Sequence, residues 1–381
     1  MALELFDWYG GGSYDTEPWP PEIDVSLQRT ESTQRWAERT TADAVRALGL
    51  TPQKRGTLVM GRFDPPHLGH AFLIRAARAA TETKVVVAVF SRAGDFVEGA
   101  TRVSALKTLV AHRGTDVVEV KVDETFPTGD PDPARWAAWF EASGLKAKVG
   151  ALVSSDANAE AFAKAAGLEF ILVDPTRQAF PISSTAIRAD PWARWDALVP
   201  ELHPRFARLV GIIGPEGGGK STVAKALGAH FNTAVGAEYR ERLAGGLSRA
   251  MLPSDVSGDA FSGHRQTNGN VRFSARRFGI VDSDLVNLKL WFERLYPNEK
   301  PFELKADQWC HHYLLFDDHP WTGAADKDQP EARRRMVHDA IQLLEANGKS
   351  WVLIDGPREG RLKKSIDALE AWVKTKPWQR P

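Results

Sequence analysis

A glycine-rich segment past the middle of the chain constrains the fold most strongly. Residues 214–222 read Gly-Pro-Glu-Gly-Gly-Gly-Lys-Ser-Thr and lie between an apolar run at 209–213 and a helical pattern that begins at Val223. Strand, glycine loop and helix in this order predict a phosphate-binding P-loop, because backbone N–H groups and the helix N-terminus then face a phosphate. Lys220 is expected to reach the β- and γ-phosphates, and Ser221 to ligate Mg²⁺.

The loop starts beyond the midpoint of a 381-residue chain, so a second domain is expected in the first half. A formal net charge of zero gives no support for a nucleic-acid or membrane partner. The single cysteine, Cys310, excludes an intramolecular disulfide and fits a reducing compartment. Without a signal peptide or a membrane-length apolar run, the sequence predicts a cytoplasmic protein with small-molecule partners. Whether it forms a homo-oligomer stays open.

Residues 55–190 alternate strand and helix, which predicts a doubly wound parallel sheet with ligands at the carboxyl ends of the strands. The expected strands are 57–60, 84–90, 117–122, 149–154 and 170–173. Residues 1–54 are interpreted as an N-terminal extension of unknown function, with an amphipathic helix at 26–48. We expect it to act as a packing extension.

Residues 191–208 are expected to connect this domain to the P-loop domain at 209–381. The expected strands of the second domain are 209–213, 278–281, 313–316 and 351–354, so both domains are expected to be α/β with parallel sheets.

A first candidate site lies in the decapeptide GRFDPPHLGH at 61–70, between the first expected strand and its helix. His67 and His70 are three residues apart and share one side of the turn. Gly69 permits close approach of a ligand, and the free N–H groups of the helix start favour a phosphate. Two alternatives stay open: a metal-binding pair and two unrelated core histidines.

This decapeptide resembles the signature of the nucleotidyltransferase superfamily of HIGH-motif enzymes, and Ile182–Arg188 is similar to the second motif, I-S-S-T-x-I-R. The resemblance implies that His67, His70 and Arg188 are catalytic. It implies ATP binding by a further set with Mg²⁺ bridging the phosphates: Gly61, Arg62, Phe63, Gly69, Ser183, Ser184 and Thr185. Arg62, Thr185 and Arg188 would hold the β/γ-phosphates.

Further stretches resemble the nicotinamide-mononucleotide adenylyltransferase half of the NadR-like bifunctional proteins. They are Val173–Arg177, Ser154–Asp156 and the pair Trp136 and Trp139. The resemblance implies that one tryptophan stacks on the nicotinamide ring and that Asp156 also binds the mononucleotide. Tryptophans at this spacing are also good core residues, and that alternative stays open. The implied reaction joins nicotinamide mononucleotide (NMN) to the α-phosphorus of ATP, giving NAD and pyrophosphate.

In the second half, an apolar strand ends in Asp282-Ser-Asp284. Asp282 suits a Walker-B role near Mg²⁺, and Asp284 could accept a proton from a substrate hydroxyl. Asp355 ends another apolar strand and ranks second for the Mg²⁺ role, because the Gly356–Gly360 loop after it resembles a nucleotide-base loop.

A polar stretch at 317–335 contains Arg333, Arg334 and Arg335 and is interpreted as a lid with phosphate-binding arginines. The alternative is a solvated helix face. The P-loop, Ala237–Arg240, Gly263–Gln266 and Asp282–Asp284 also resemble the NadR-like family, which implies a ribosylnicotinamide kinase. Glu238 and Tyr239 would then hold nicotinamide riboside. ATP contacts would come from Gly214, Glu216, Gly217, Gly218, Gly219, Ser221, Thr222, Arg333 and Arg334.

Three departures from the family pattern are visible. Residues 1–54 do not resemble the N-terminal helix-turn-helix of some members, so no DNA-binding role is expected. The stretch after Gly245 is unusually polar and glycine-rich for the helix expected there. The lid reads Asp326-Lys-Asp-Gln329 and so departs from the family's D-G-x-R pattern. Two other functions therefore stay open: an adenylyltransferase whose P-loop domain only binds nucleotide, and an NAD-responsive regulator.

Overall fold

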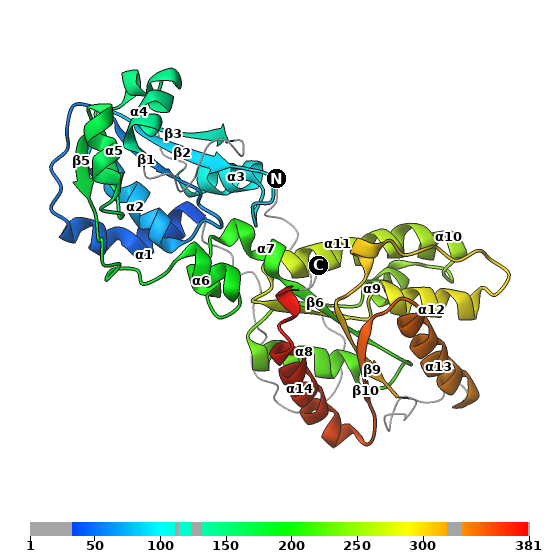
Figure 1. Cartoon of the computed structure of the whole chain (residues 1–381). Coiled ribbons are helices and arrows are strands. Elements are labelled where there is room, and N and C mark those ends of the chain that lie inside the picture. Colours follow the sequence, from blue (N-terminus) through cyan, green and yellow to red (C-terminus); the bar gives the residue numbers. More distant parts are fainter. Residues whose placement is uncertain (1–32, 111–113, 123–131, 318–329, 380–381) are drawn as a thin grey trace. The chain divides into compact units, whose positions relative to one another are not determined.

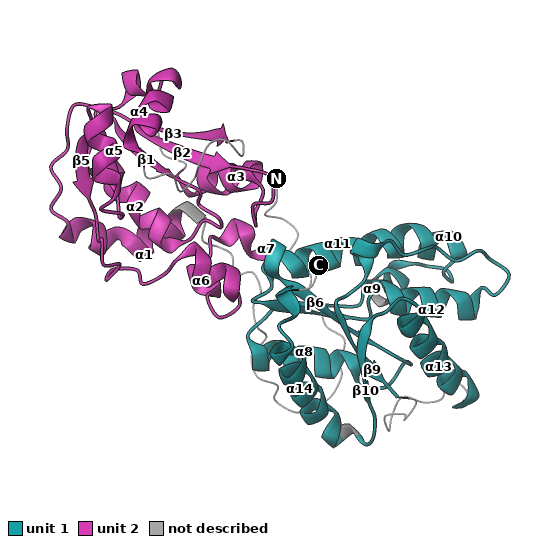
Figure 2. Ribbon diagram, viewed as in Figure 1, with its two compact units in different colours: residues 1–30, 204–381 teal, residues 31–203 magenta. Residues whose placement is uncertain are grey.

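The computed structural model describes residues 33–110, 114–122, 132–317 and 330–379. They form two compact units, one within residues 31–203 and the other within 204–381 (Figure 2). The division after His203 places most of the expected connector, residues 191–203, in the first unit. Helix α1 (Thr33–Ala47), from the expected N-terminal extension, also belongs to the first unit, where it packs on α2 and α3.

The first unit contains a five-stranded parallel sheet of order β3-β2-β1-β4-β5. The strands are β1 (Thr57–Gly61), β2 (Val85–Ser91), β3 (Thr115–Lys121), β4 (Ala151–Ser154) and β5 (Glu169–Leu172). Every residue of β2, Val-Val-Val-Ala-Val-Phe-Ser, is buried, as expected for a parallel strand covered on both faces. The strand order reverses at β1, which makes the crevice between β1 and β4 the expected ligand position.

Helices cover both faces of this sheet (Figure 1). They include α2 (Leu68–Ala79), α3 (Gly99–Leu109), α4 (Pro133–Ala142) and α5 (Ala159–Ala166), and the short α6 (Ser184–Ala189) follows β5. The Asp132 side chain accepts a hydrogen bond from the Ala134 amide at 2.9 Å, so that α4 starts with an aspartate cap and a proline in its first turn. The core under α4 and α5 contains Leu58, Val86 and Leu152.

The second unit contains a parallel sheet of order β10-β9-β6-β8-β7. The strands are β6 (Arg208–Ile213), β7 (Val235–Gly236), β8 (Phe278–Asp282), β9 (His312–Phe316) and β10 (Ser350–Ile354). The P-loop strand β6 is thus central, with β8 and β9 beside it. Both units have the α/β fold with parallel sheets that the sequence predicts. The two-residue strand β7 was not expected, because it is too short to show a hydrophobic pattern.

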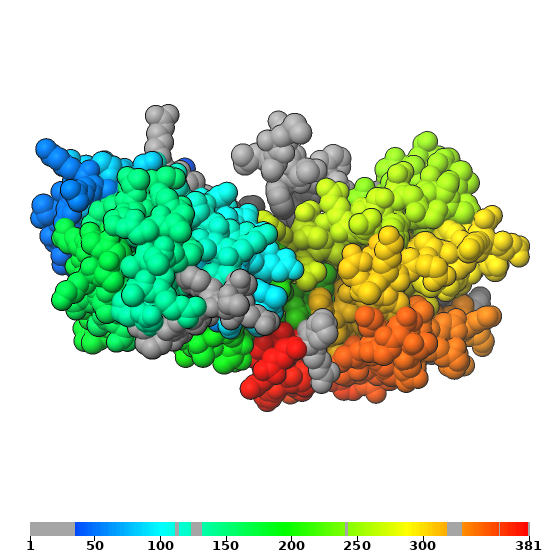
Figure 3. Space-filling model, turned by 45° about the horizontal axis from the view of Figure 1, so that its top comes forward, coloured from blue at the N-terminus to red at the C-terminus, as the bar shows by residue number. Residues whose placement is uncertain are grey.

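The main helices of this unit are α8 (Lys220–Phe231), α9 (Tyr239–Gly246), α11 (Phe261–Ser274), α12 (Leu285–Leu295), α13 (Pro330–Ala346) and α14 (Arg358–Lys374). The polar stretch after Gly245 is largely helical: α10 (Pro253–Asp255) and a π-helical turn (Val256–Ala260) lead into α11. Helices α12 and α13 pack on each other (yellow and orange in Figure 3). Within the described residues, none of the helices is long and apolar enough to cross a bilayer.

Candidate active sites

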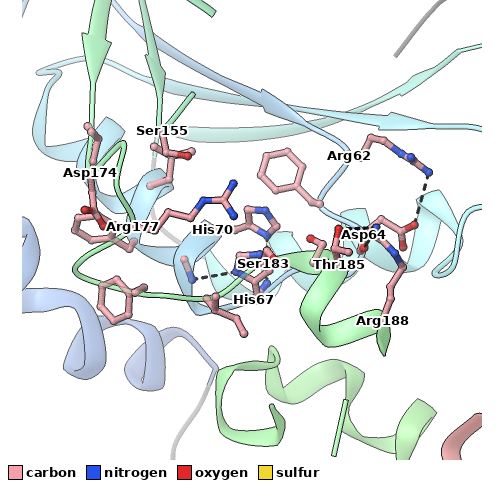
Figure 4. A pocket seen from close by; sticks show the side chains of 18 residues that line it. Arg62, Asp64, His67, His70, Ser155, Asp174, Arg177, Ser183, Thr185 and Arg188 are labelled. Carbon is pink, nitrogen blue, oxygen red and sulfur yellow. Dashed lines mark hydrogen bonds and ion pairs between the residues drawn. The ribbon is translucent and has the colours of Figure 1, made fainter. Parts of the chain in front are cut away.

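A pocket of about 410 Å³ opens in the first unit at the carboxyl ends of β1, β4 and β5 (Figure 4). Its lining includes most of the residues that the two motifs predict for ATP: Arg62, Phe63, His67, Gly69, His70, Ser183, Ser184, Thr185 and Arg188. The pocket thus lies where the strand order reverses, the position expected for a ligand in an open α/β sheet. Residues from the β5–α6 turn, including Asp174 and Arg177, complete it.

The two motifs are joined by direct hydrogen bonds. The Ser184 hydroxyl donates to the Pro65 carbonyl at 3.1 Å, and the Arg188 guanidinium donates to the Asp64 carbonyl. Arg188 also donates to the Thr185 hydroxyl at 3.0 Å. Ser183 caps α6, because its hydroxyl accepts from the Ala186 amide at 3.1 Å. The second motif therefore holds the turn of the first.

His67 and His70 form a stacked pair whose ring centroids are 3.7 Å apart. The His67 Nδ1 atom accepts from the Gly69 amide at 3.1 Å, and the His70 Nδ1 atom accepts from the His67 amide at 3.3 Å. Because both Nδ1 atoms act as acceptors, the neutral rings carry their proton on Nε2. A Cβ atom at Gly69 would lie 3.1 Å from the His67 ring, which is a tight contact.

The electrostatic environment keeps both imidazoles neutral. Burial, with a further contribution from the Arg177 charge, lowers the pKa of His67 to about 3. Burial, His67 and Arg177 lower the pKa of His70 well below its usual value. At neutral pH the pair therefore presents N–H donors without charge. Among the described residues no group of three or more His, Cys, Asp or Glu side chains could hold a metal ion.

Arg62 does not face the histidines. Its guanidinium forms an ion pair with Asp95, whose side chain is 1% exposed, and points away from the His pair in Figure 4. Asp95 also pairs with the wholly buried Arg102, and Arg102 donates to the Arg62 carbonyl. Asp64 accepts from the amide of Val97 at 2.8 Å. Neither Asp95 nor Arg102 was singled out from the sequence, and together they fix the turn after β1.

The predicted NMN residues lie outside the lining of this pocket. The indoles of Trp136 and Trp139 pack edge-on against Phe90, with ring centroids 5.1 and 5.4 Å away, and contact the core under α4. Both indoles are only partly buried, and Phe90 lies at the carboxyl end of β2. The core interpretation is therefore supported, and stacking on nicotinamide stays a prediction. Asp156 is exposed and caps the turn before α5 by accepting from the Asn158 amide at 3.0 Å.

In the second unit the P-loop has the expected backbone form, with positive φ at Gly214, Gly217 and Gly219. The Lys220 ammonium donates to the Pro215 carbonyl at 2.9 Å. A Cβ atom at Gly214 would lie 2.5 Å from the Phe316 carbonyl oxygen, so only glycine fits there. Ser221 and Thr222 lie in the first turn of α8, where their hydroxyls can reach a nucleotide and its Mg²⁺.

Two arginines of the second unit bind P-loop carbonyls. Arg361, which is 3% exposed, donates to the carbonyls of Gly218 at 2.7 Å and Gly356 at 2.9 Å and pairs with Asp317. Arg333 is buried and donates to the Glu216 carbonyl, so its guanidinium contacts the backbone of the P-loop. Arg334 is exposed on α13. The remainder of the predicted lid, residues 318–329, lies outside the described residues.

Asp282 lies beside the P-loop, because it ends β8 opposite Ile212 of the central strand. Asp355 follows the outer strand β10, is exposed and pairs with Lys364. This arrangement favours Asp282 for the Mg²⁺ role. Asp284 is fully buried and caps α12 by accepting from the amides of Val286 and Asn287. Burial raises its pKa to about 6, against the lowering effect of neighbouring hydrogen bonds.

Arg240 organises the predicted riboside residues, although the sequence did not single it out. Its guanidinium forms ion pairs of 2.9 Å with both Glu216 and Glu238, and it lies 4.5 Å over the Trp291 ring. Glu216 of the P-loop and Glu238 are thus linked through one cation. Tyr239 begins α9 and packs against Gly263, where a Cβ atom would lie 2.1 Å from its ring.

Comparison with known proteins agrees with this division. A cytidylyltransferase-like family model matches residues 58–190, and an AAA domain model matches residues 209–361. The trifunctional NAD biosynthesis/regulator protein NadR of Salmonella typhimurium is 25% identical, over 84% of this chain and 83% of the relative. NadR of Escherichia coli is 27% identical, over 81% of this chain and 82% of the relative.

Solved structures give the same picture of the fold. A crystal structure of NadR in complex with NR has a TM-score of 0.65 and 18% identity, over 84% of this chain and 97% of that chain. A NadR complex with NAD and AMP-PNP has a TM-score of 0.64 and 16% identity over the same shares.

Fold and sites together define a two-domain nucleotide-binding protein, in which a cytidylyltransferase-like unit precedes a P-loop unit. In domain order, fold and sequence, the chain is NadR-like.

Proposed function

We propose that this chain is an NAD-biosynthetic enzyme with two activities, a nicotinamide-nucleotide adenylyltransferase in the first unit and a ribosylnicotinamide kinase in the second. The observation that carries the proposal is the neutral His67–His70 donor pair, held at the strand-order reversal and closed by the second motif through Arg188 and Ser184. Buried donors of this kind stabilise charge that develops on phosphate oxygens.

In the first reaction, a 5′-phosphate oxygen of NMN attacks the α-phosphorus of ATP. A new P–O bond forms, the bond from the α-phosphorus to the bridging oxygen breaks, and pyrophosphate leaves with the electron pair. No protein nucleophile is required, because the protein positions the two phosphates and stabilises their charge. Nε2–H groups of His67 and His70 would contact the reacting phosphates, while Thr185 and Arg188 would bind the β/γ-phosphates.

In the second reaction, the 5′-hydroxyl of nicotinamide riboside attacks the γ-phosphorus of ATP, and ADP leaves. Lys220 would contact the β/γ-phosphates, and Ser221 and Asp282 would hold Mg²⁺, which would neutralise phosphate charge. Asp284 is our candidate proton acceptor, because a carboxyl with a pKa of about 6 suits proton transfer near neutral pH. Glu238 and Tyr239 would hold the riboside. Both reactions are proposed to take place in the cytoplasm.

The test is incubation of the protein with nicotinamide riboside, ATP and Mg²⁺, with products followed by chromatography. NAD formation supports both activities. NAD formation from added NMN without conversion of the riboside would instead assign the P-loop unit to nucleotide binding alone. If neither substrate is converted, both enzymatic proposals fail, and an NAD-responsive regulator becomes the better hypothesis.

A further inference from the structure

The turn between β5 and α6 holds its backbone in a conformation that ordinary residues rarely adopt. Asp174 and Arg177 have φ values of 47° and 55°, in the left-handed region. The Asp174 carboxylate stabilises the turn by accepting from the amides of Gln178 at 2.8 Å and Ala179 at 3.0 Å. The Arg177 amide donates to the Asp174 carbonyl at 2.9 Å. Such strain persists only where the surroundings enforce it.

This turn presents the Arg177 guanidinium to the pocket. In Figure 4 its side chain extends to the His70 ring from the β5 side, whereas Arg188 and Arg62 lie on the other side of the histidine pair. The pocket therefore has cationic groups on both sides of its two uncharged N–H donors. A reaction between two phosphates needs such an arrangement, since each reactant brings its own negative charge.

Of the three arginines that line the pocket, Arg62 is paired with Asp95, and Arg188 is bound to the Asp64 carbonyl and to Thr185. Within the described parts of the chain, the Arg177 guanidinium has no hydrogen-bond or ion-pair partner. Neutral histidines supply no charge of their own. The cation available to a bound anion on the β5 side is therefore Arg177, and a guanidinium binds phosphate through paired N–H groups.

We propose that Arg177 binds the 5′-phosphate of the acceptor mononucleotide and holds it against the His67–His70 pair, opposite the triphosphate. This inference rests on the proposed adenylyltransferase. By neutralising the acceptor phosphate, Arg177 reduces its repulsion from the α-phosphate during attack. Arg177 would thus determine affinity for a phosphorylated acceptor, while Thr185 and Arg188 bind ATP.

The experiment measures NAD formation from NMN in the full chain, with KM determined separately for NMN and for ATP. The key variant is Arg177→Gly, because glycine adopts positive φ without strain and preserves the turn. We expect the KM for NMN to rise about 10- to 100-fold, the effect of losing a charged hydrogen bond, with the KM for ATP changed less than about twofold. Arg177→Lys should restore part of the NMN affinity, since it keeps the charge without the paired donors.

Gln178→Ala is the matched control, because it truncates an exposed neighbour on the same turn and keeps the amide that bonds to Asp174. Its kinetic constants should equal those of the wild type. The inference is overturned if Arg177→Gly leaves the KM for NMN unchanged, or if it raises the KM for ATP instead. Absence of NAD formation by the wild-type chain would be a failure of the proposed function itself, so the two failures are distinguishable.

Discussion

Arg188 donates a hydrogen bond to the main-chain carbonyl of Asp64, and this contact joins the two halves of the first site. Ser184 makes a parallel contact with Pro65, 119 residues away in the sequence. The β1 turn that contains the histidine pair is therefore braced by the segment after β5. Because Arg188 is also a predicted ATP ligand, the same side chain would have both a structural and a binding role.

Substitution of one residue in each unit should separate the two activities. Lys220→Ala should abolish conversion of nicotinamide riboside but leave NAD formation from NMN unchanged. His67→Ala should reduce NAD formation by about 10²–10³-fold, the usual effect of losing one charge-stabilising donor, and leave riboside phosphorylation intact. Chromatographic assays with each substrate measure both rates. Unchanged NAD synthesis in His67→Ala would show that the first site is wrongly placed.

The histidine pair should not titrate in the physiological range. Because burial and Arg177 lower the pKa of His67 to about 3, protonation is disfavoured, and the ring stays neutral from pH 5 to pH 8. The same causes act on His70. Nitrogen-15 NMR of labelled histidines should show the Nε2–H tautomer for both rings, with no change over this range. A midpoint near 6.5 for either pocket ring would contradict the assignment.

Arg361 should affect the P-loop unit alone. Arg361→Ala removes the donor that ties the Gly218 carbonyl to Gly356 and Asp317, so the loop loses its support. We expect the KM for ATP in riboside phosphorylation to rise about tenfold or more, since a hydrogen bond from a charged donor contributes about 1.5–3 kcal/mol. NAD formation from NMN should stay at the wild-type rate.

The control for this experiment is Lys363→Ala on the same helix, since the Lys363 side chain is 78% exposed and pairs with Asp367 one turn away. Such a surface ion pair contributes little to stability, so both activities of the Lys363→Ala variant should match those of the wild type. An equal effect of the two substitutions would mean that Arg361 supports α14 in general and has no special relation to the P-loop.

The buried Asp284 carboxylate should destabilise the folded chain at neutral pH. Its folded pKa of about 6 lies above the unfolded value of about 3.9, so between these values the folded chain keeps a proton that the unfolded chain releases. The stability contribution of this group therefore falls as pH rises from about 4 to 6 and is constant above. Asp284→Asn keeps a capping oxygen without the charge. It should raise the free energy of unfolding at pH 7 by up to about 3 kcal/mol, with little gain at pH 4.

The same Asp284→Asn substitution should abolish riboside phosphorylation if the carboxylate accepts the proton. Urea unfolding at the two pH values, with a kinase assay at pH 7, measures both effects. A variant that phosphorylates riboside at the wild-type rate would leave Asp284 as a helix cap and require another proton acceptor.

The sequence predicted most of the architecture, because long β-branched runs such as β2 and the glycine spacing of the P-loop act locally. The resemblance of both motifs to one family signature also predicted that His67 and Arg188 belong to one site. Arg102 and Asp95 were not predicted. Their importance comes from the burial of their side chains and from mutual pairing, and neither property has a local sequence signal.

Other differences have similar causes. Arg240 acts as the bridge between Glu216 and Glu238 only because α9 brings it beside the P-loop. The stretch after Gly245 folds into α11 despite its polar composition, because His264, Asn268 and Val271 face inward on one side of the helix. Tertiary burial outweighs weak helix propensity there. Arg177 was visible in the sequence, but its orientation depends on two left-handed residues in a turn.

The bracing of the β1 turn by Ser184 and Arg188 also has a consequence for synthesis. A nascent chain that has emerged only as far as Leu172 already contains all five strands of the first sheet, but lacks the segment that binds the carbonyls of Asp64 and Pro65. Since domains generally fold as units, the closed nucleotide pocket can form only after the segment that contains Ser184 and Arg188 has left the ribosome. A product that ends before Ser184 would thus lack both contacts that brace the β1 turn.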